Sequence, residues 1–217
     1  MYENSKLKEI NDIYFYIKDE IKSRLDEFKR IWRTGSEENV FAELIFCILT
    51  PQSRAKSCWA AVESLRDKNL LFRGGKNQIA GELAGVRFKY KKAEYIFEAR
   101  AFFSIDGRIS IKPMLEKFKN AYDMRNWLVQ NVKGVGYKEA SHFLRNIGFG
   151  ENLAILDRHI LKNLRLIGLI NDIPGCLSRK RYFEIERKMR EFSGKVKIPM
   201  AHLDLLMWYK ETGEIFK

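Results

Sequence analysis

Two glycines interrupt a helical pattern near the middle of the chain, and this break constrains the fold more than any other feature. The stretch 127–132 has apolar residues at the spacing expected for the end of a helix. The stretch 138–147 resumes that spacing after Gly134 and Gly136. A glycine has no Cβ, so it allows positive φ and a close approach of the backbone. The sequence therefore predicts two helices joined by a tight hairpin at 132–137.

The same hairpin is a candidate anion site. A helix that begins directly after two glycines points unpaired N–H groups at whatever lies in front of it, and such groups suit a phosphate. Gly134, Val135 and Gly136 are therefore candidate residues for binding a phosphate backbone. The alternative is an ordinary glycine turn between two packed helices, because short glycine motifs are weak evidence when taken alone.

Composition agrees with an all-α protein that binds a polyanion. The chain has 217 residues, only 4 prolines and a formal net charge of +12 at pH 7, which suits a nucleic acid partner. Its apolar runs follow helical rather than strand spacing, and Ser36 and Ser53 are predicted to cap two of the helices. No apolar run reaches the ~20 residues that span a bilayer, and the charged stretch 1–20 does not resemble a signal peptide. We therefore expect a cytoplasmic protein, or a nuclear one if the source is eukaryotic, with no membrane partner.

Lys138 and Asp157 are the two candidate catalytic residues. Lys138 falls in the first turn of the helix after the hairpin, where the helix dipole disfavours a cation and so favours the neutral, nucleophilic amine. Asp157 precedes the apolar-periodic run 160–167 and is predicted to be its N-cap. A capping carboxylate has a fixed direction and could stabilise a developing positive charge. The alternatives are a lysine that contacts only solvent or phosphate, and an aspartate that only caps.

The segments Gly134-Val135-Gly136-Tyr137-Lys138-Glu139-Ala140 and Leu156-Asp157-Arg158-His159-Ile160 together resemble the catalytic core of the helix-hairpin-helix DNA glycosylases. Three further segments, 49–56, 86–96 and 203–217, are similar to the archaeal-type (second class) 8-oxoguanine DNA glycosylase/AP lyases. The resemblance covers roughly residues 37–217. It implies two helical lobes with a DNA-binding cleft between them.

The resemblance also implies an activity. Lys138 falls on the family's nucleophile, which forms a Schiff base with the sugar, and Asp157 falls on its carboxylate. The expected enzyme is bifunctional: it removes 8-oxoguanine from duplex DNA and cleaves the strand 3′ to the abasic site by β-elimination. Two alternatives stay open, namely a glycosylase for another oxidised or alkylated base and a non-enzymatic helix-hairpin-helix DNA-binding module.

Four further residues are implied to recognise the lesion: Gln52, Phe88, Trp208 and Lys217. Gln52 matches a polar position near the lesion, and Trp208 matches an aromatic under the flipped base, with Phe88 a candidate for its other face. The chain as given ends at Lys217, whose terminal carboxylate would accept a bond from the N7–H that distinguishes 8-oxoguanine from guanine. The alternatives are core packing for Trp208 and Phe88, and a solvated terminus for Lys217.

Cysteine and histidine usage indicates no metal centre. The three cysteines, Cys47, Cys58 and Cys176, are far apart and form neither a disulfide framework nor a zinc pair, and they are too few for a four-cysteine iron–sulfur cluster. His159 lies two positions after Asp157, and residues two apart on a helix do not face each other, so we expect it to pack or to support a neighbouring site residue. We therefore expect no cofactor. The resemblance implies that hairpin carbonyls could hold a structural monovalent cation.

The organisation expected from the breaks in the pattern is a single glycosylase unit over residues 1–217. One lobe would combine residues 1–70 with 175–217, and the other would hold residues 71–174 with the hairpin. The expected state is a monomer whose partner is duplex DNA containing 8-oxoguanine.

Overall fold

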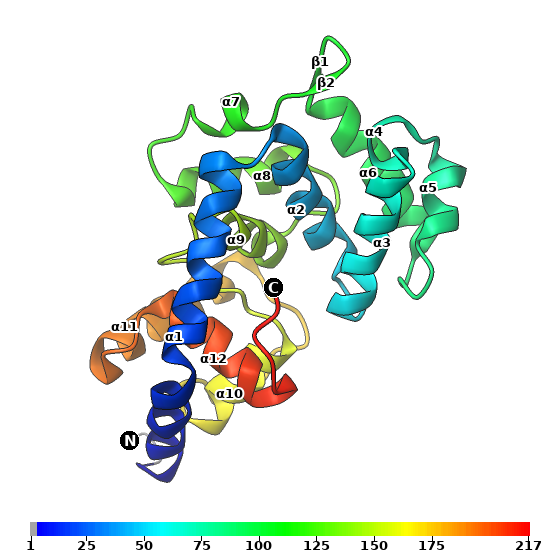
Figure 1. The fold of residues 1–217 in the computed structure, drawn as a ribbon. Coiled ribbons are helices and arrows are strands. Elements are labelled where there is room, and N and C mark those ends of the chain that lie inside the picture. Colours follow the sequence, from blue (N-terminus) through cyan, green and yellow to red (C-terminus); the bar gives the residue numbers. More distant parts are fainter. Residues whose placement is uncertain (1–3) are drawn as a thin grey trace.

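The computed structural model describes residues 4–217 and consists of helices joined by short turns (Figure 1). α1 (Asn4–Thr34) is the longest helix and runs along most of the height of the molecule. The other helices are α2 (Glu37–Leu49), α3 (Ala55–Asp67), α4 (Leu70–Arg73), α5 (Lys76–Glu82), α6 (Lys89–Phe102), α7 (Lys112–Leu115), α8 (Ala121–Asn131), α9 (Tyr137–Asn146), α10 (Arg158–Leu166), α11 (Arg179–Val196) and α12 (Met200–Thr212). The all-α prediction is confirmed.

A short β-hairpin is the only regular secondary structure other than helix among the described residues. β1 (Ser104–Ile105) pairs antiparallel with β2 (Arg108–Ile109). Asp106 and Gly107 join the two strands, and both residues have positive φ, as a type I′ turn requires.

One of the two predicted serine caps is confirmed and the other is wrong. Ser36 caps α2, because its Oγ accepts the N–H of Asn39 at 3.2 Å. Ser53 does not cap α3, whose N-cap residue is Arg54 without a side-chain bond. The Ser53 hydroxyl instead accepts a bond from the buried ammonium of Lys92 at 3.0 Å. A charged donor bonds more strongly than a neutral backbone N–H, so this long-range contact takes the hydroxyl away from the helix end.

Lys92 shapes the turn between α2 and α3. Its ammonium also donates to the carbonyls of Leu49 and Pro51, each at 2.7 Å. Burial lowers the pKa of Lys92, and these three oxygens compensate for the loss of water around the charge. Hydrogen bonds from Lys92 of α6 therefore hold the turn that contains Gln52 in place.

Two hydrophobic clusters make up the interior. The first gathers buried residues of α2, α3, α6, α8 and α9 and extends from Val40 to Leu153. The second gathers parts of α1 with the chain from Ala154 to Ile215, including α10, α11 and α12. Residues 40–65 therefore pack with the middle of the chain in the first cluster. Residues 154–170 pack with the two ends of the chain in the second cluster. The division into lobes at residues 70 and 175 stays a prediction about domains.

A buried ion pair ties the two clusters together. Arg125 of α8 and Glu186 of α11 are both buried, and the Arg125 Nη2 donates to Glu186 Oε1 at 2.9 Å. The other carboxylate oxygen of Glu186 accepts the N–H of Ala154 at 2.8 Å. This carboxylate therefore fixes the segment that leads from the hairpin unit to Asp157.

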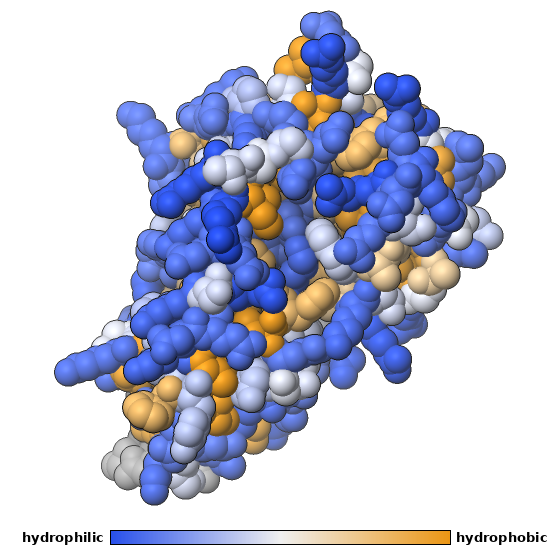
Figure 2. Space-filling model, in the orientation of Figure 1, coloured by the Kyte–Doolittle hydropathy of each residue, from blue (hydrophilic) through white to orange (hydrophobic). Residues whose placement is uncertain are grey.

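One face of the molecule shows how its surface is composed. Figure 2 shows a face covered mostly by hydrophilic side chains, with hydrophobic ones in small, separate patches. Within residues 4–217, no helix has the length and apolar character needed to cross a membrane.

Candidate active site

The hairpin between α8 and α9 needs glycine at one of its two glycine positions for conformational reasons. Gly134 has φ +81°, and a Cβ there would lie 2.4 Å from the ring of Tyr95. Gly136 has φ −95° and ψ −175°, which is extended backbone that other residues also adopt. A Cβ at Gly136 would meet Glu139 Oε2 at 3.0 Å. Gly136 therefore has neither positive φ nor a close backbone neighbour, and a Cβ there would press only on the end of the Glu139 side chain.

Two of the hairpin N–H groups are already bonded within the protein. Val135 donates to the carbonyl of Val132 at 3.3 Å, and Gly136 donates to Glu139 Oε2 at 3.1 Å. The second bond is half of a capping box, in which a glutamate in the first turn satisfies a donor before the helix. The phosphate-binding role of Gly134, Val135 and Gly136 stays a prediction, and Glu139 is the group that a phosphate near Gly136 would meet.

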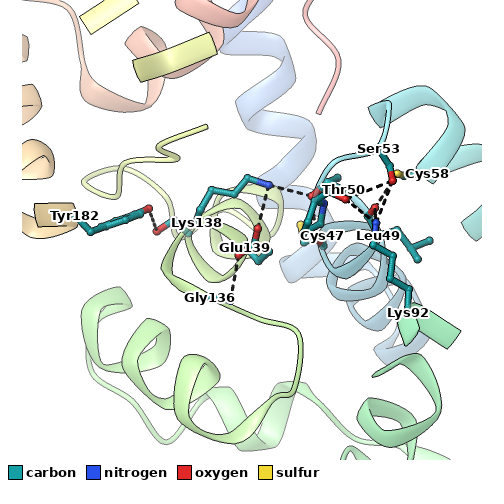
Figure 3. Close-up of polar contacts among 12 residues, drawn as sticks. Cys47, Leu49, Thr50, Ser53, Cys58, Lys92, Gly136, Lys138, Glu139 and Tyr182 are labelled. Carbon is teal, nitrogen blue, oxygen red and sulfur yellow. Dashed lines mark hydrogen bonds and ion pairs between the residues drawn. The ribbon is translucent and has the colours of Figure 1, made fainter. Parts of the chain in front are cut away.

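Lys138 lies in the first turn of α9, as predicted, and its amine points toward the C-terminal end of α2 (Figure 3). The Nζ donates to Thr50 Oγ1 at 3.2 Å and lies 3.2 Å from Glu139 Oε1. The Thr50 hydroxyl in turn donates to the carbonyl of Cys47 at 2.8 Å. The side chain of Lys138 is only 21% exposed. The amine is thus held in one direction by groups on both of the helices that flank it.

Asp157 is the N-cap of α10, as predicted. Its Oδ1 accepts the N–H of Ile160 at 2.8 Å, and its own N–H donates to the carbonyl of Ile155 at 2.8 Å. These bonds fix both the backbone and the carboxylate. Because one bond involves only Oδ1, the cap leaves the rest of the carboxylate available to the cleft in front of it.

A cleft of about 930 Å³ brings most of the predicted site residues together. Its walls come from the turn after α2, from α9, from the start of α10, from the segment before α11 and from α12. The predicted residues among its lining are Gln52, Lys138, Asp157, Trp208 and Lys217. The cleft is therefore built from both hydrophobic clusters, as expected for a site between two lobes.

Phe88 lies outside this cleft. It is 58% exposed and occupies the N-cap position of α6 with φ +59°, while its neighbour Arg87 lines the cleft. Gln52 also has positive φ, at +56°, and is exposed at the cleft. Positive φ is uncommon for residues other than glycine and often marks functional segments. The structure gives no contact between Phe88 and the cleft, so its role in holding the base stays a prediction.

Trp208 presents its indole to the cleft from α12. The buried Nε1 of Trp208 has no hydrogen-bond partner among the described residues. The ring of His159 packs against it edge-on, with 5.1 Å between the ring centroids. His159 therefore packs against the tryptophan, in agreement with the role expected for it.

The side chain of Lys217 is anchored in the wall of the cleft. Its ammonium pairs with Glu43 of α2 and lies 3.5 Å from the centroid of the Trp59 ring. Both partners of the ion pair are almost fully buried. The last residue of the chain consequently lies against α2.

A buried polar network connects this anchor to the floor of the cleft. The other oxygen of Glu43 accepts from Asn146 Nδ2 at 2.9 Å, and Asn146 Oδ1 accepts from Arg145 Nε at 3.1 Å. Arg145 Nη1 then donates to Asp204 Oδ2 at 2.6 Å. Sequence reasoning missed these residues. One feature of the sequence could have indicated the network: Glu43 is a charged residue between apolar residues of a helix.

The stability of the fold should depend on pH through Asp204. Burial raises the pKa of Asp204 to about 6, against the attraction of Arg145, and the nearby charge of Asp157 acts in the same direction as burial. Between its ordinary value of 3.8 and about 6, the folded protein binds more protons at this site than the unfolded chain. The contribution of Asp204 to stability therefore falls as pH rises through this window.

We expect the Asp204→Asn variant to lack this contribution. The unfolding free energy of the native chain minus that of the variant, measured by urea titration, should decrease between pH 4 and pH 6. A difference that stays constant over this window, or that grows, would contradict the assignment.

The described residues contain no group of three or more histidine, cysteine, aspartate or glutamate side chains that could hold a metal ion. Cys47 and Cys58 are buried and Cys176 is exposed, and all three are free thiols.

The fold and the cleft together define the class of protein. Two helices joined by a glycine hairpin present a lysine to a cleft, and a helix N-cap supplies a carboxylate to the same cleft. This arrangement defines a helix-hairpin-helix protein of the DNA glycosylase class.

Comparison with known proteins identifies the family. A family model described as 8-oxoguanine DNA glycosylase matches residues 21–198. The chain belongs to the 8-oxoguanine DNA glycosylase family. A protein of Fusobacterium nucleatum named 8-oxoguanine DNA glycosylase/AP lyase is 47% identical over 217 residues, which is 100% of each chain.

Solved structures agree with this assignment. The 8-oxoguanine glycosylase/lyase of Methanocaldococcus jannaschii, in complex with a 15mer DNA containing 8-oxoguanine, is 39% identical, with a TM-score of 0.88 over 97% of this chain and 99% of that chain. The 8-oxoguanine DNA glycosylase of Thermotoga maritima is 35% identical, with a TM-score of 0.88 over 99% of each chain.

Proposed function

We propose that this chain excises 8-oxoguanine from duplex DNA and then cleaves the strand 3′ to the abasic site. The observation that carries the proposal is the placement of Lys138, whose half-buried amine is held at a cleft that Asp157 and Trp208 also line. The relatives named above carry the same activity in their names. The net charge of +12 supplies the general attraction for DNA phosphates.

The reaction follows from these positions. The damaged nucleotide rotates out of the duplex, and its base enters the cleft beside Trp208. The amine of Lys138 attacks C1′, the bond from C1′ to the base breaks, and its electron pair leaves with the base. Asp157 stabilises the positive charge that develops on the sugar.

Strand cleavage completes the sequence. The attached nitrogen of Lys138 loses a proton, and its electron pair forms a double bond to C1′ as the bond from C1′ to the ring oxygen breaks. The ring oxygen takes up a proton, and the product is an open-chain Schiff base. Loss of a proton from C2′ then breaks the bond from C3′ to its oxygen, and the phosphate leaves with the electron pair. Water hydrolyses the Schiff base and releases Lys138.

Borohydride trapping tests the proposal, because it reduces the Schiff base to a stable covalent adduct. Duplexes would carry 8-oxoguanine, thymine glycol or undamaged guanine at one position. We expect an adduct on the 8-oxoguanine duplex alone. An adduct on thymine glycol instead would change the substrate, and no adduct on any duplex would favour a DNA-binding module without chemistry.

Three further expectations belong to the same proposal. The chain acts as a monomer in the cytoplasm and needs no cofactor. A monovalent cation at the hairpin would be coordinated by backbone carbonyl oxygens. One of these carbonyls, that of Val132, already accepts a hydrogen bond from the N–H of Val135. The cation stays a prediction, and no step above depends on it.

A further inference from the structure

His142 has a position in the cleft that no step described so far uses. It lies one turn after Lys138 on α9, and side chains four residues apart share one face of a helix. It lines the cleft and is only 7% exposed. Neither of its ring nitrogens has a hydrogen-bond partner among the described residues. A buried polar ring that the protein leaves unpaired requires a partner from outside the protein.

The surroundings of His142 determine its charge. Burial lowers the pKa of His142 well below its ordinary value, and the positive charges of Arg145, Lys138 and Lys217 act in the same direction. The main chain of Lys217 approaches the ring without reaching hydrogen-bond geometry and opposes part of the shift. At neutral pH the imidazole is therefore uncharged, with one N–H donor and one lone-pair acceptor.

Phe46 packs against the imidazole ring of His142. The two ring centroids lie 5.5 Å apart in an edge-to-face arrangement. This contact limits how the imidazole can turn. A donor and an acceptor are thus held in a fixed position beside the amine that attacks C1′.

We propose that His142 is a lesion-recognition residue whose imidazole hydrogen-bonds to the edge of the extruded oxopurine. The inference rests on the proposed function. The base is bonded to the carbon that Lys138 attacks, so it must lie close to the next turn of α9. An oxopurine offers both carbonyl oxygens and ring N–H groups. The N–H of a neutral imidazole can donate to such a carbonyl, and its other nitrogen can accept from such an N–H.

The test compares two substrates in single-turnover reactions with the full chain. One duplex carries 8-oxoguanine and the other carries an abasic site, which has no base to contact. For His142→Phe we expect 8-oxoguanine excision to fall on the order of tenfold, the loss expected for one hydrogen bond. Trapping on the abasic site should stay within about twofold of the native chain. The conservative variant His142→Gln should retain more excision than His142→Phe.

Thermal unfolding separates this role from a structural one. Because the protein leaves the imidazole unpaired, His142→Phe should not lower the melting temperature. His202 provides the matched control, since it lies outside the cleft and its ring bonds to the hydroxyl of Tyr14 at 3.0 Å. His202→Phe should lower the melting temperature without changing the ratio of excision to abasic-site trapping.

Two outcomes would overturn the inference. One is excision of 8-oxoguanine by His142→Phe at the native rate. The other is an equal loss on both substrates together with a lower melting temperature, which would make His142 a packing residue. Failure of the proposed function is distinguishable, because the native chain itself would then show no excision of 8-oxoguanine.

Discussion

The Lys138→Gln variant should form no borohydride-trapped adduct and should bind duplex DNA almost as well as the native chain. A glutamine amide cannot form a Schiff base, whereas it keeps a polar side chain in the first turn of α9. The measurement is gel analysis of trapped complexes, with binding followed separately by fluorescence anisotropy. Loss of signal should be complete, because the other route to an adduct would need another amine at C1′.

Lys133 supplies the control for this experiment. It lies in the same hairpin, is well exposed and pairs with Glu98 at 3.0 Å. Lys133→Gln removes the same charge from the same segment and should trap at the native level. If Lys138→Gln still forms an adduct, the nucleophile is another amine, and mass spectrometry of the trapped peptide would locate it.

The Asp157→Asn variant should lose catalysis while keeping its fold. Asparagine caps helices about as well as aspartate, so the bond to the N–H of Ile160 and the start of α10 should persist. The charge that faces the sugar is lost, and we expect the single-turnover excision rate to fall by roughly 10²–10⁴-fold. Circular dichroism and thermal unfolding would verify that α10 is intact.

A different result would assign Asp157 a purely structural role. Asp157→Ala removes both the cap and the charge, so it should lose both stability and excision. If Asp157→Asn excises at the native rate and only Asp157→Ala is impaired, the carboxylate serves the helix and another group stabilises the sugar.

The parts of the site that the sequence predicted depend on local signals. A glycine hairpin places Lys138 in the first turn of α9, and the apolar pattern after Asp157 makes it an N-cap. Both follow from a few neighbouring residues, so no tertiary information is needed. The cleft could be expected only through the family resemblance, which aligns segments that are far apart along the chain.

The parts that could not be predicted depend on long-range packing. Glu43 and Lys217 pair across 174 positions, and nothing near either residue indicates the other. Ser53 was expected to cap a helix, but Lys92 from another helix binds its hydroxyl. The burial of His142 likewise results from packing against α2, through Phe46. Such contacts are properties of the folded chain as a whole.

The burial of Cys47 and Cys58 has a consequence for an enzyme that meets oxidants. Burial raises the pKa of the Cys47 thiol well above its ordinary value and that of Cys58 to about 11. Peroxides oxidise thiolates rather than thiols, so both side chains react slowly at neutral pH. The carbonyl of Cys47 supports Thr50, which holds the amine of Lys138. The reactive oxygen species that create 8-oxoguanine in DNA thus leave the support of the nucleophile chemically intact.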